Sequence, residues 1–169
     1  MEIKSIKTNF ALLFYPMIER IKKIIYSELN SIEVFFIDSQ NIAKIDKNHL
    51  IELVYFLKVH KDLYFDVLSC ISAVDYINYF RVFYNLHSIT KNLHLIVCTE
   101  ISVNEKLPSL SNLYSSAEWH EREVYDMMGI QFENHPDLRR ILLPDDWEGF
   151  PLLKNYQTQE VYHNIKVKY

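Results

Sequence analysis

The chain has 169 residues, of which 49% are hydrophobic and 24% charged, and a formal net charge of −4 at pH 7. That length fits one domain, and the slightly acidic balance argues against nucleic acid or an anionic lipid surface as the main partner. Gly129 and Gly149 are the only glycines, which excludes glycine-rich phosphate loops of the Rossmann and P-loop kinds. Cys70 and Cys98 are the only cysteines, too few to hold an iron–sulfur cluster alone. Because both lie in apolar segments, we expect two buried thiols in a reducing compartment.

The first predicted helix begins at Pro16 and ends near Leu29, because isoleucines recur through it at helical spacing. The lysines and apolar residues before it resemble a signal peptide, but no small-residue cleavage site follows. We therefore interpret the segment as part of the mature protein. No apolar stretch approaches the roughly 20 residues that a membrane-spanning helix needs. We expect any membrane association to come through another protein.

A strand is predicted over residues 32–37 and a second helix after Asp46, whose carboxylate is suited to capping it. This helix should end near His60. Its buried face is predicted to consist of Leu50, Leu53, Val54 and Leu57.

β-structure is predicted from residue 63 onward, with strands over residues 63–74, 80–88 and 92–101. The last two are separated by a short connection and form an antiparallel hairpin. One face of its first strand carries Phe80, Val82, Tyr84 and Leu86, and one face of its second carries Leu93, Leu95 and Val97. The order of helices and strands predicts an α+β fold, with helices packed on a mostly antiparallel sheet.

A third helix is predicted to end at Gly129, because apolar residues before it lie close to helical spacing: Leu113, Ala117, Val124 and Met128. Periodicity then stops, although the remaining residues are rich in aromatics. Long irregular segments are usually functional or disordered, and this one is too aromatic for a solvated tail. We predict an α+β domain over residues 1–130, and an extended C-terminal arm over residues 131–169 that docks on partner subunits.

Residues 119–130 read WHEREVYDMMGI, a density of charge that admits several interpretations. His120 and Glu121 begin like a helical zinc motif, but Val124 occupies the position of the second histidine. No spacing links the other potential ligands to this helix: His94, Cys98 and His135. A metal site is therefore not indicated.

Acid–base catalysis is also disfavoured, because Arg122 lies among the carboxylates of this helix: Glu118, Glu121, Glu123 and Asp126. Alone, the segment would be read as a solvated helix face, with exposed ion pairs worth less than about 1 kcal/mol each. It continues, however, into residues 131–150, where arginines alternate with apolar residues around Trp147. Arginine and tryptophan are enriched in protein interfaces, so the whole stretch predicts a docking surface.

The same residues resemble the signature of the thirty-kilodalton subunit family of respiratory complex I, the proton-pumping NADH:quinone oxidoreductase. The matching elements are Glu121-Arg122-Glu123, Asp126, His135, Arg139 and Ile141-Leu142. The resemblance covers roughly residues 30–169 and is strongest after residue 118. It departs at Leu153 and Asn155, where the family usually has charged residues. Ion pairs anchored there are therefore not expected.

The resemblance implies a non-redox structural subunit of the hydrophilic arm, with no catalytic, cofactor-binding or metal-binding residues of its own. FMN, iron–sulfur clusters and quinone would reside in partner subunits. The chief partners would be the quinone-site protein, which is the forty-nine-kilodalton subunit, and its cluster-bearing neighbour. The location implied is peripheral, on the cytoplasmic face of a bacterial inner membrane, or its matrix or stromal equivalent in an organelle.

The interface or signature residues implied are Glu118, Glu121, Arg122, Glu123, Asp126, His135, Pro136, Asp137, Arg139, Arg140, Trp147 and Gly149. Arg122 is expected to fix the helix between Glu118 and Asp126, and residues 135–150 to form a clamp. An alternative is the homologous scaffold of a membrane-bound hydrogenase or formate–hydrogen lyase. An autonomous α+β enzyme or nucleic-acid-binding module is the alternative of another class, but it would need features, such as a basic sheet face, that are not indicated.

Overall fold

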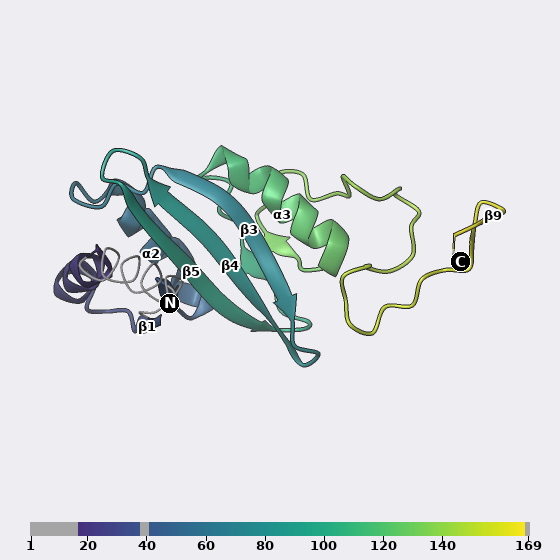
Figure 1. Ribbon diagram of the computed structural model, residues 1–169, viewed down its shortest axis with the longest axis horizontal. Helices are drawn as coiled ribbons and strands as arrows, with labels where there is room; N and C mark the ends of the chain where they lie inside the picture. Colours follow the sequence, from purple (N-terminus) through teal and green to yellow (C-terminus); the bar gives the residue numbers. More distant parts are fainter. Residues whose placement is uncertain (1–16, 38–40, 168–169) are drawn as a thin grey trace, which may run out of the picture. The chain divides into compact units, whose positions relative to one another are not determined.

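The computed structural model describes residues 17–37 and 41–167 (Figure 1). The predicted start of the first helix at Pro16, with the signal-peptide question before it, lies outside these residues. By contacts the chain divides into two units, one of residues 1–70 and 83–99 and the other of residues 71–82 and 100–169.

The first helix covers residues 17–28. The elements that follow are β1 (Phe35–Ile37), β2 (Ile42–Lys44), a 3-10 helix (Lys47–His49), α2 (Leu50–Val59), β3 (Val67–Asp75), β4 (Tyr79–Ser88), β5 (Leu93–Ser102), β6 (Leu107–Pro108), α3 (Ser115–Met128), β7 (Phe132–Glu133), β8 (Val161–Tyr162) and β9 (Ile165–Lys166).

The main sheet has five strands in the order β1-β2-β5-β4-β3, and Figure 1 shows its three long strands side by side. β1 is antiparallel to β2, whereas β2 runs parallel to β5 with Ile42 opposite Ile96. The connections from β3 to β4 and from β4 to β5 are too short for a crossover, so these pairs are antiparallel. The α+β prediction is confirmed, with a mixed and mostly antiparallel sheet.

The helices of the first unit form as predicted. The carboxylate of Asp46 accepts a hydrogen bond from the backbone N–H of Asn48 at 2.8 Å and caps the 3-10 turn that leads into α2. α2 ends at Val59, next to the predicted His60, and its buried residues are Leu50, Leu53, Val54 and Leu57. In the first helix the stripe of Ile18, Ile21 and Ile25 is buried. Each such side chain contributes roughly 1.5–3 kcal/mol through removal from water.

The predicted hairpin is β4 and β5, and all the residues assigned to its inward faces are buried. Cys98 is buried as predicted, but the prediction that Cys70 is buried is wrong. β3 is the last strand of the sheet, so one of its edges has no neighbouring strand. Leu68 and Ile71 take its core positions, which leaves Ser69 and Cys70 exposed.

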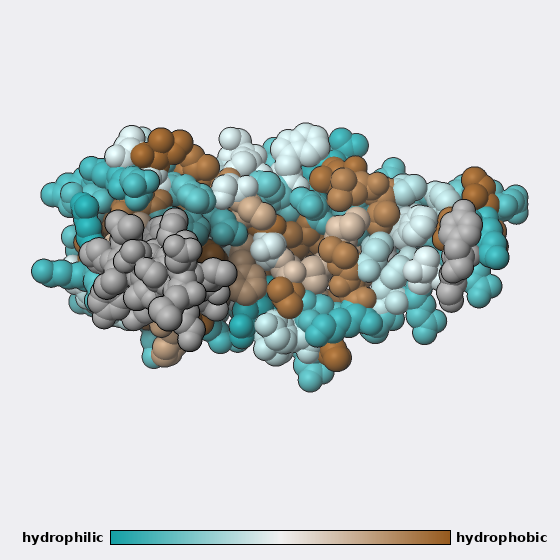
Figure 2. All heavy atoms as spheres, in the orientation of Figure 1, coloured by the Kyte–Doolittle hydropathy of each residue, from teal (hydrophilic) through white to brown (hydrophobic). Residues whose placement is uncertain are grey.

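Two small sheets complete the described chain. β6 pairs in parallel with β7, and β8 pairs with β9 as an antiparallel hairpin. Hydrophobic side chains are also exposed on both units, and Figure 2 shows them as separate patches among hydrophilic residues. Single exposed hydrophobic residues are normal for a soluble surface.

Candidate functional site

α3 carries the charged stripe, and its end is fixed by Gly129. Gly129 adopts a left-handed conformation with φ 74°, and its N–H donates to the carbonyl of Tyr125. This is the predicted stop. A Cβ at this position would lie 2.6 Å from the Phe150 ring, so glycine is required both by the backbone and by this contact.

Asp126 lies near the end of α3 with its carboxylate fully buried. One oxygen accepts a hydrogen bond from Arg140 at 2.7 Å. The other accepts from the backbone N–H groups of Ile141, Leu142 and Leu143 at 3.0, 2.7 and 3.0 Å. We call Asp126, Arg140 and residues 141–143 the Asp126 cluster. Burial by itself raises the pKa of Asp126, but these donors outweigh it and hold the pKa below its ordinary value.

Arg140 extends the Asp126 cluster to the turn that follows it. Besides the carboxylate, its guanidinium donates to the carbonyls of Asp126, Trp147 and Gly149 at 3.0, 3.1 and 2.9 Å. The same group lies 5.0 Å from the centre of the Phe150 ring. A guanidinium has five N–H donors in a rigid fork, and this site uses that geometry to join α3 to residues 147–150.

Glu121 is the second buried carboxylate of α3. It accepts hydrogen bonds from the Ser109 hydroxyl at 2.6 Å and from the Leu110 N–H at 2.7 Å. His135 Nε2 lies 4.0 Å from it, with both side chains fully buried. We call these residues the Glu121 cluster. Burial raises the pKa of Glu121 to about 7, although its two hydrogen bonds oppose the rise.

The tautomer of His135 follows from its partners. Its Nδ1 accepts from the backbone N–H of Asp137 at 3.0 Å, so Nδ1 carries no proton. Its Nε2 lies 3.0 Å from the Glu118 carbonyl, an acceptor, so Nε2 donates. A neutral His135 protonated on Nε2 satisfies both contacts and ties the chain after β7 to α3.

Arg122 differs from its expected role. Its Nε donates to the Arg139 carbonyl at 3.3 Å, and its guanidinium lies 4.8 Å from the Trp119 ring centre. Within the described residues it forms no ion pair with Glu118 or Asp126, because Arg140 takes the Asp126 carboxylate.

The remaining signature residues lie at or near the surface. Arg139 pairs at 2.8 Å with Asp137, and both side chains are exposed. Glu123 and Pro136 are exposed, whereas Trp147 is half-buried and donates through Nε1 to the Tyr156 hydroxyl at 3.1 Å. Gly149 has φ 79°. The structure therefore uses Glu121, Asp126, His135 and Arg140 inside the chain and leaves Glu123, Pro136, Asp137 and Arg139 outward.

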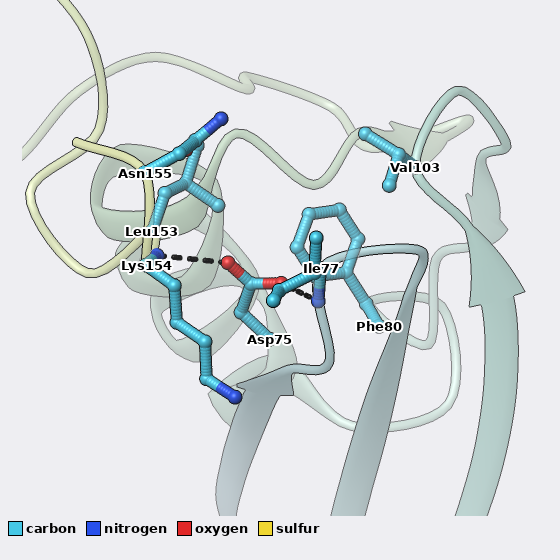
Figure 3. A pocket seen from close by; sticks show the side chains of 7 residues that line it. All are labelled: Asp75, Ile77, Phe80, Val103, Leu153, Lys154 and Asn155. Carbon is cyan, nitrogen blue, oxygen red and sulfur yellow. Dashed lines mark hydrogen bonds between the residues drawn. The ribbon is translucent and has the colours of Figure 1, made fainter.

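Two contact residues are not evident from the sequence. One is Ser109, which gives Glu121 its hydroxyl donor. The other is Asp75 at the end of β3, whose carboxylate accepts from the N–H groups of Ile77 and Lys154, as Figure 3 shows. Asp75 lines a cavity of about 60 Å³ together with Ile77, Phe80, Val103, Leu153, Lys154 and Asn155. An aspartate before a strand turn was the only available signal, since Lys154 is 79 residues away.

Neither a metal nor a membrane is indicated by the described residues. Over residues 17–37 and 41–167, no group of three or more His, Cys, Asp and Glu side chains is placed to hold a metal ion. Within the same part of the chain, no helix has the length and apolar character needed to span a bilayer.

The fold and the site define an α+β domain in which buried charges tie the segment after the last long helix to that helix. The chain belongs to the complex I 30 kDa subunit family: residues 43–162 match the family described as "Respiratory-chain NADH dehydrogenase, 30 Kd subunit".

Individual relatives agree with this family, and each is named as a subunit of NADH-quinone oxidoreductase. The chain is 45% identical over 120 residues to the relative from Chloroherpeton thalassium, covering 69% of this chain and 50% of that relative. It is 41% identical over 129 residues to the protein of the same name in Chlorobium phaeobacteroides, covering 74% of this chain and 78% of that one. The chain thus spans about half of the first relative and most of the second.

A solved structure shares the fold. It is described as the membrane-bound sulfane sulfur reductase, an archaeal respiratory membrane complex. The likeness has a TM-score of 0.64 with 22% sequence identity, and covers 76% of this chain and 77% of that chain. At this identity the comparison supports the fold alone.

Proposed function

We propose that the chain is a non-redox structural subunit in the hydrophilic arm of the proton-pumping NADH:quinone oxidoreductase. It supports the quinone-site protein while electrons pass from NADH to quinone. One observation carries the proposal: the Asp126 cluster uses the charges of the family signature to hold residues 140–150 in one conformation. Charges employed in this way position a surface and are not free for chemistry.

The surface so positioned suits a protein partner. Trp119, Leu142 and Leu152 are each more than half exposed, and they lie on α3 or on the segment that the Asp126 cluster holds or follows. Exposed aromatic and aliphatic side chains rimmed by charges such as Arg139 are typical of protein interfaces. We assign no catalytic residue to this chain, and the enzyme activity belongs to the assembled complex.

The partners that fit this role are the quinone-site protein, which is the forty-nine-kilodalton subunit, and its cluster-bearing neighbour. FMN, iron–sulfur clusters and quinone belong to the partner subunits, and the chain reaches the membrane through them. The location that follows from this proposal is the cytoplasmic face of a bacterial inner membrane, or the equivalent face in an organelle.

A second candidate is the equivalent scaffold in a membrane-bound hydrogenase or formate–hydrogen lyase. Its support is the fold shared with a respiratory membrane complex of another kind. Purification of the native complex and identification of its other subunits distinguishes the two candidates. NADH-oxidising subunits support the first candidate, and a hydrogenase large subunit supports the second.

Arg140→Ala tests the structural role. Removing one member of a buried, hydrogen-bonded charge pair costs about 2–5 kcal/mol, because Asp126 is left buried with less compensation. At the lower limit this weakens association by roughly 30-fold. We expect less assembled complex on native gels and less NADH:quinone activity in the same membranes, with turnover per assembled complex nearly unchanged.

Arg139→Ala is the matched control, because Arg139 is adjacent, exposed, and paired only with Asp137 through its side chain. Its carbonyl contact with Arg122 survives the substitution. We expect near-normal assembly. Normal assembly of the Arg140→Ala complex with abolished turnover would place Arg140 in the catalytic path and refute the structural role.

A further inference from the structure

Two histidines face each other across the β4–β5 hairpin. His87 is one residue before the end of β4, and His94 is one residue after the start of β5. Their ring centroids are 4.5 Å apart and their planes are inclined by 27°. Both residues are half-buried, so solvent and small ions reach the rings.

Neither ring has another polar partner among the described residues. Other histidines of the chain are engaged: His60 with Glu28, His135 with Glu118 and Asp137, and His163 with Asp146. His87 and His94 have only each other. Stacked imidazoles gain no hydrogen bond from this arrangement, and their nitrogens remain available as ligands.

The pair is suited to the neutral state that a metal requires. Burial lowers the pKa of His94, and the neighbouring His87 lowers it further. Two adjacent imidazolium ions would repel each other, so protonation of both rings is disfavoured. A metal binds only the neutral ring, so the arrangement removes part of the competition from protons.

We propose that His87 and His94 form a two-imidazole site for a divalent transition-metal ion of the class that prefers nitrogen ligands, such as Cu²⁺, Ni²⁺ or Zn²⁺. The hairpin holds the two backbones at cross-strand distance, which preorganises the ligands. Metal–nitrogen bonds of about 2.0–2.1 Å at a tetrahedral angle need the two nitrogens roughly 3.3 Å apart. With the ring centroids at 4.5 Å, side-chain rotation achieves this without moving either strand.

The chemistry of the site follows from its ligand count. Within the described residues no third His, Cys, Asp or Glu joins the pair, so water completes the coordination shell. Such a site exchanges its ion readily. Cu²⁺ should bind most tightly, because the affinity order of nitrogen sites peaks at copper.

The test is a Cu²⁺ titration of the full chain at pH 7.5, monitored by isothermal calorimetry and by electron paramagnetic resonance. We expect one ion coordinated by two nitrogens in the unchanged chain. His87→Gln and His94→Gln should each weaken that binding by about tenfold or more and leave a single nitrogen ligand. The matched control is His120→Gln, which replaces another half-buried histidine, on α3, and should bind as the unchanged chain does.

Circular dichroism establishes that each variant remains folded, and a second readout is independent of affinity. Cu²⁺ should raise the melting temperature of the unchanged chain and of His120→Gln, and should not raise that of either pair variant. Equal Cu²⁺ affinity in the unchanged chain and the His94→Gln variant, or a one-nitrogen spectrum in the unchanged chain, would overturn the proposal.

Discussion

Glu121 and Asp126 are buried carboxylates on the same helix, yet their pKa values move in opposite directions. Asp126 receives a guanidinium and three backbone N–H donors, and its pKa falls. Glu121 receives one hydroxyl and one N–H, no cation compensates its burial, and its pKa rises to about 7. The sequence places both residues on a charged helix and cannot show this difference, because Ser109 and Arg140 come from separate segments.

Glu121→Gln should remove a pH dependence of stability. The pKa of Glu121 is raised above its ordinary value of 4.5 in the folded state, so its stabilising contribution is full below pH 4.5. It is lost as the pH rises through about 7. Since a tenfold change in proton affinity is worth about 1.4 kcal/mol, the loss is about 3 kcal/mol at most.

Urea unfolding between pH 4.5 and pH 8 measures this effect. The free energy of unfolding of the unchanged chain should fall relative to that of Glu121→Gln as pH rises, because other groups titrate in both proteins. The control is Glu123→Gln, an exposed neighbour on α3, whose curve should follow the unchanged chain. Parallel curves for the unchanged chain and Glu121→Gln would show that Glu121 titrates normally.

At the scale of elements, the end of α3 depends on Gly129. Gly129→Ala places a side chain at φ 74° and a Cβ 2.6 Å from Phe150. We expect a loss of about 1–3 kcal/mol in the free energy of unfolding, from backbone strain and from displacement of the ring.

Two further variants separate these causes in thermal or urea unfolding. Gly129→Asn keeps the Cβ but tolerates the left-handed conformation better, so it should recover part of the loss. Phe150→Leu should reduce the cost of Gly129→Ala if the ring contact contributes. An unchanged cost in the Phe150→Leu background would assign the whole effect to the backbone.

The sequence predicted the elements whose evidence is local. The stripe of α2, the Asp46 cap and the alternation of β4 and β5 are patterns within one segment, and all were confirmed. β2 and β6 were missed because they are three and two residues long and pair with distant strands, as Ile42 does with Ile96. Cys70 was wrongly assigned because apolar sequence neighbours do not reveal an edge strand.

For the whole molecule, the predicted division into a domain of residues 1–130 and an arm of residues 131–169 remains a prediction. The lack of periodicity after Gly129 correctly indicated irregular backbone but not how it is held. Its contacts join residues far apart in the sequence, such as Asp75 with Lys154 and Asp126 with Leu143. Only the resemblance to a family indicated that Asp126 and the arginines after it belong together.

Hydrogen exchange on the isolated chain tests how far the segment after Gly129 is ordered without a partner. The N–H groups of residues 141–143 donate to a buried carboxylate, so they should exchange slowly. No such contact is found for the N–H groups of residues 157–159 among the described residues, and these should exchange fast. Asp126→Asn should release residues 141–143, because an amide cannot accept all the hydrogen bonds that the carboxylate does. If a partner alone ordered the whole segment, residues 141–143 would exchange as fast as residues 157–159 in the isolated chain. They would then become protected only in the assembled complex, and the Asp126 cluster would be a product of assembly instead of a feature of the free protein.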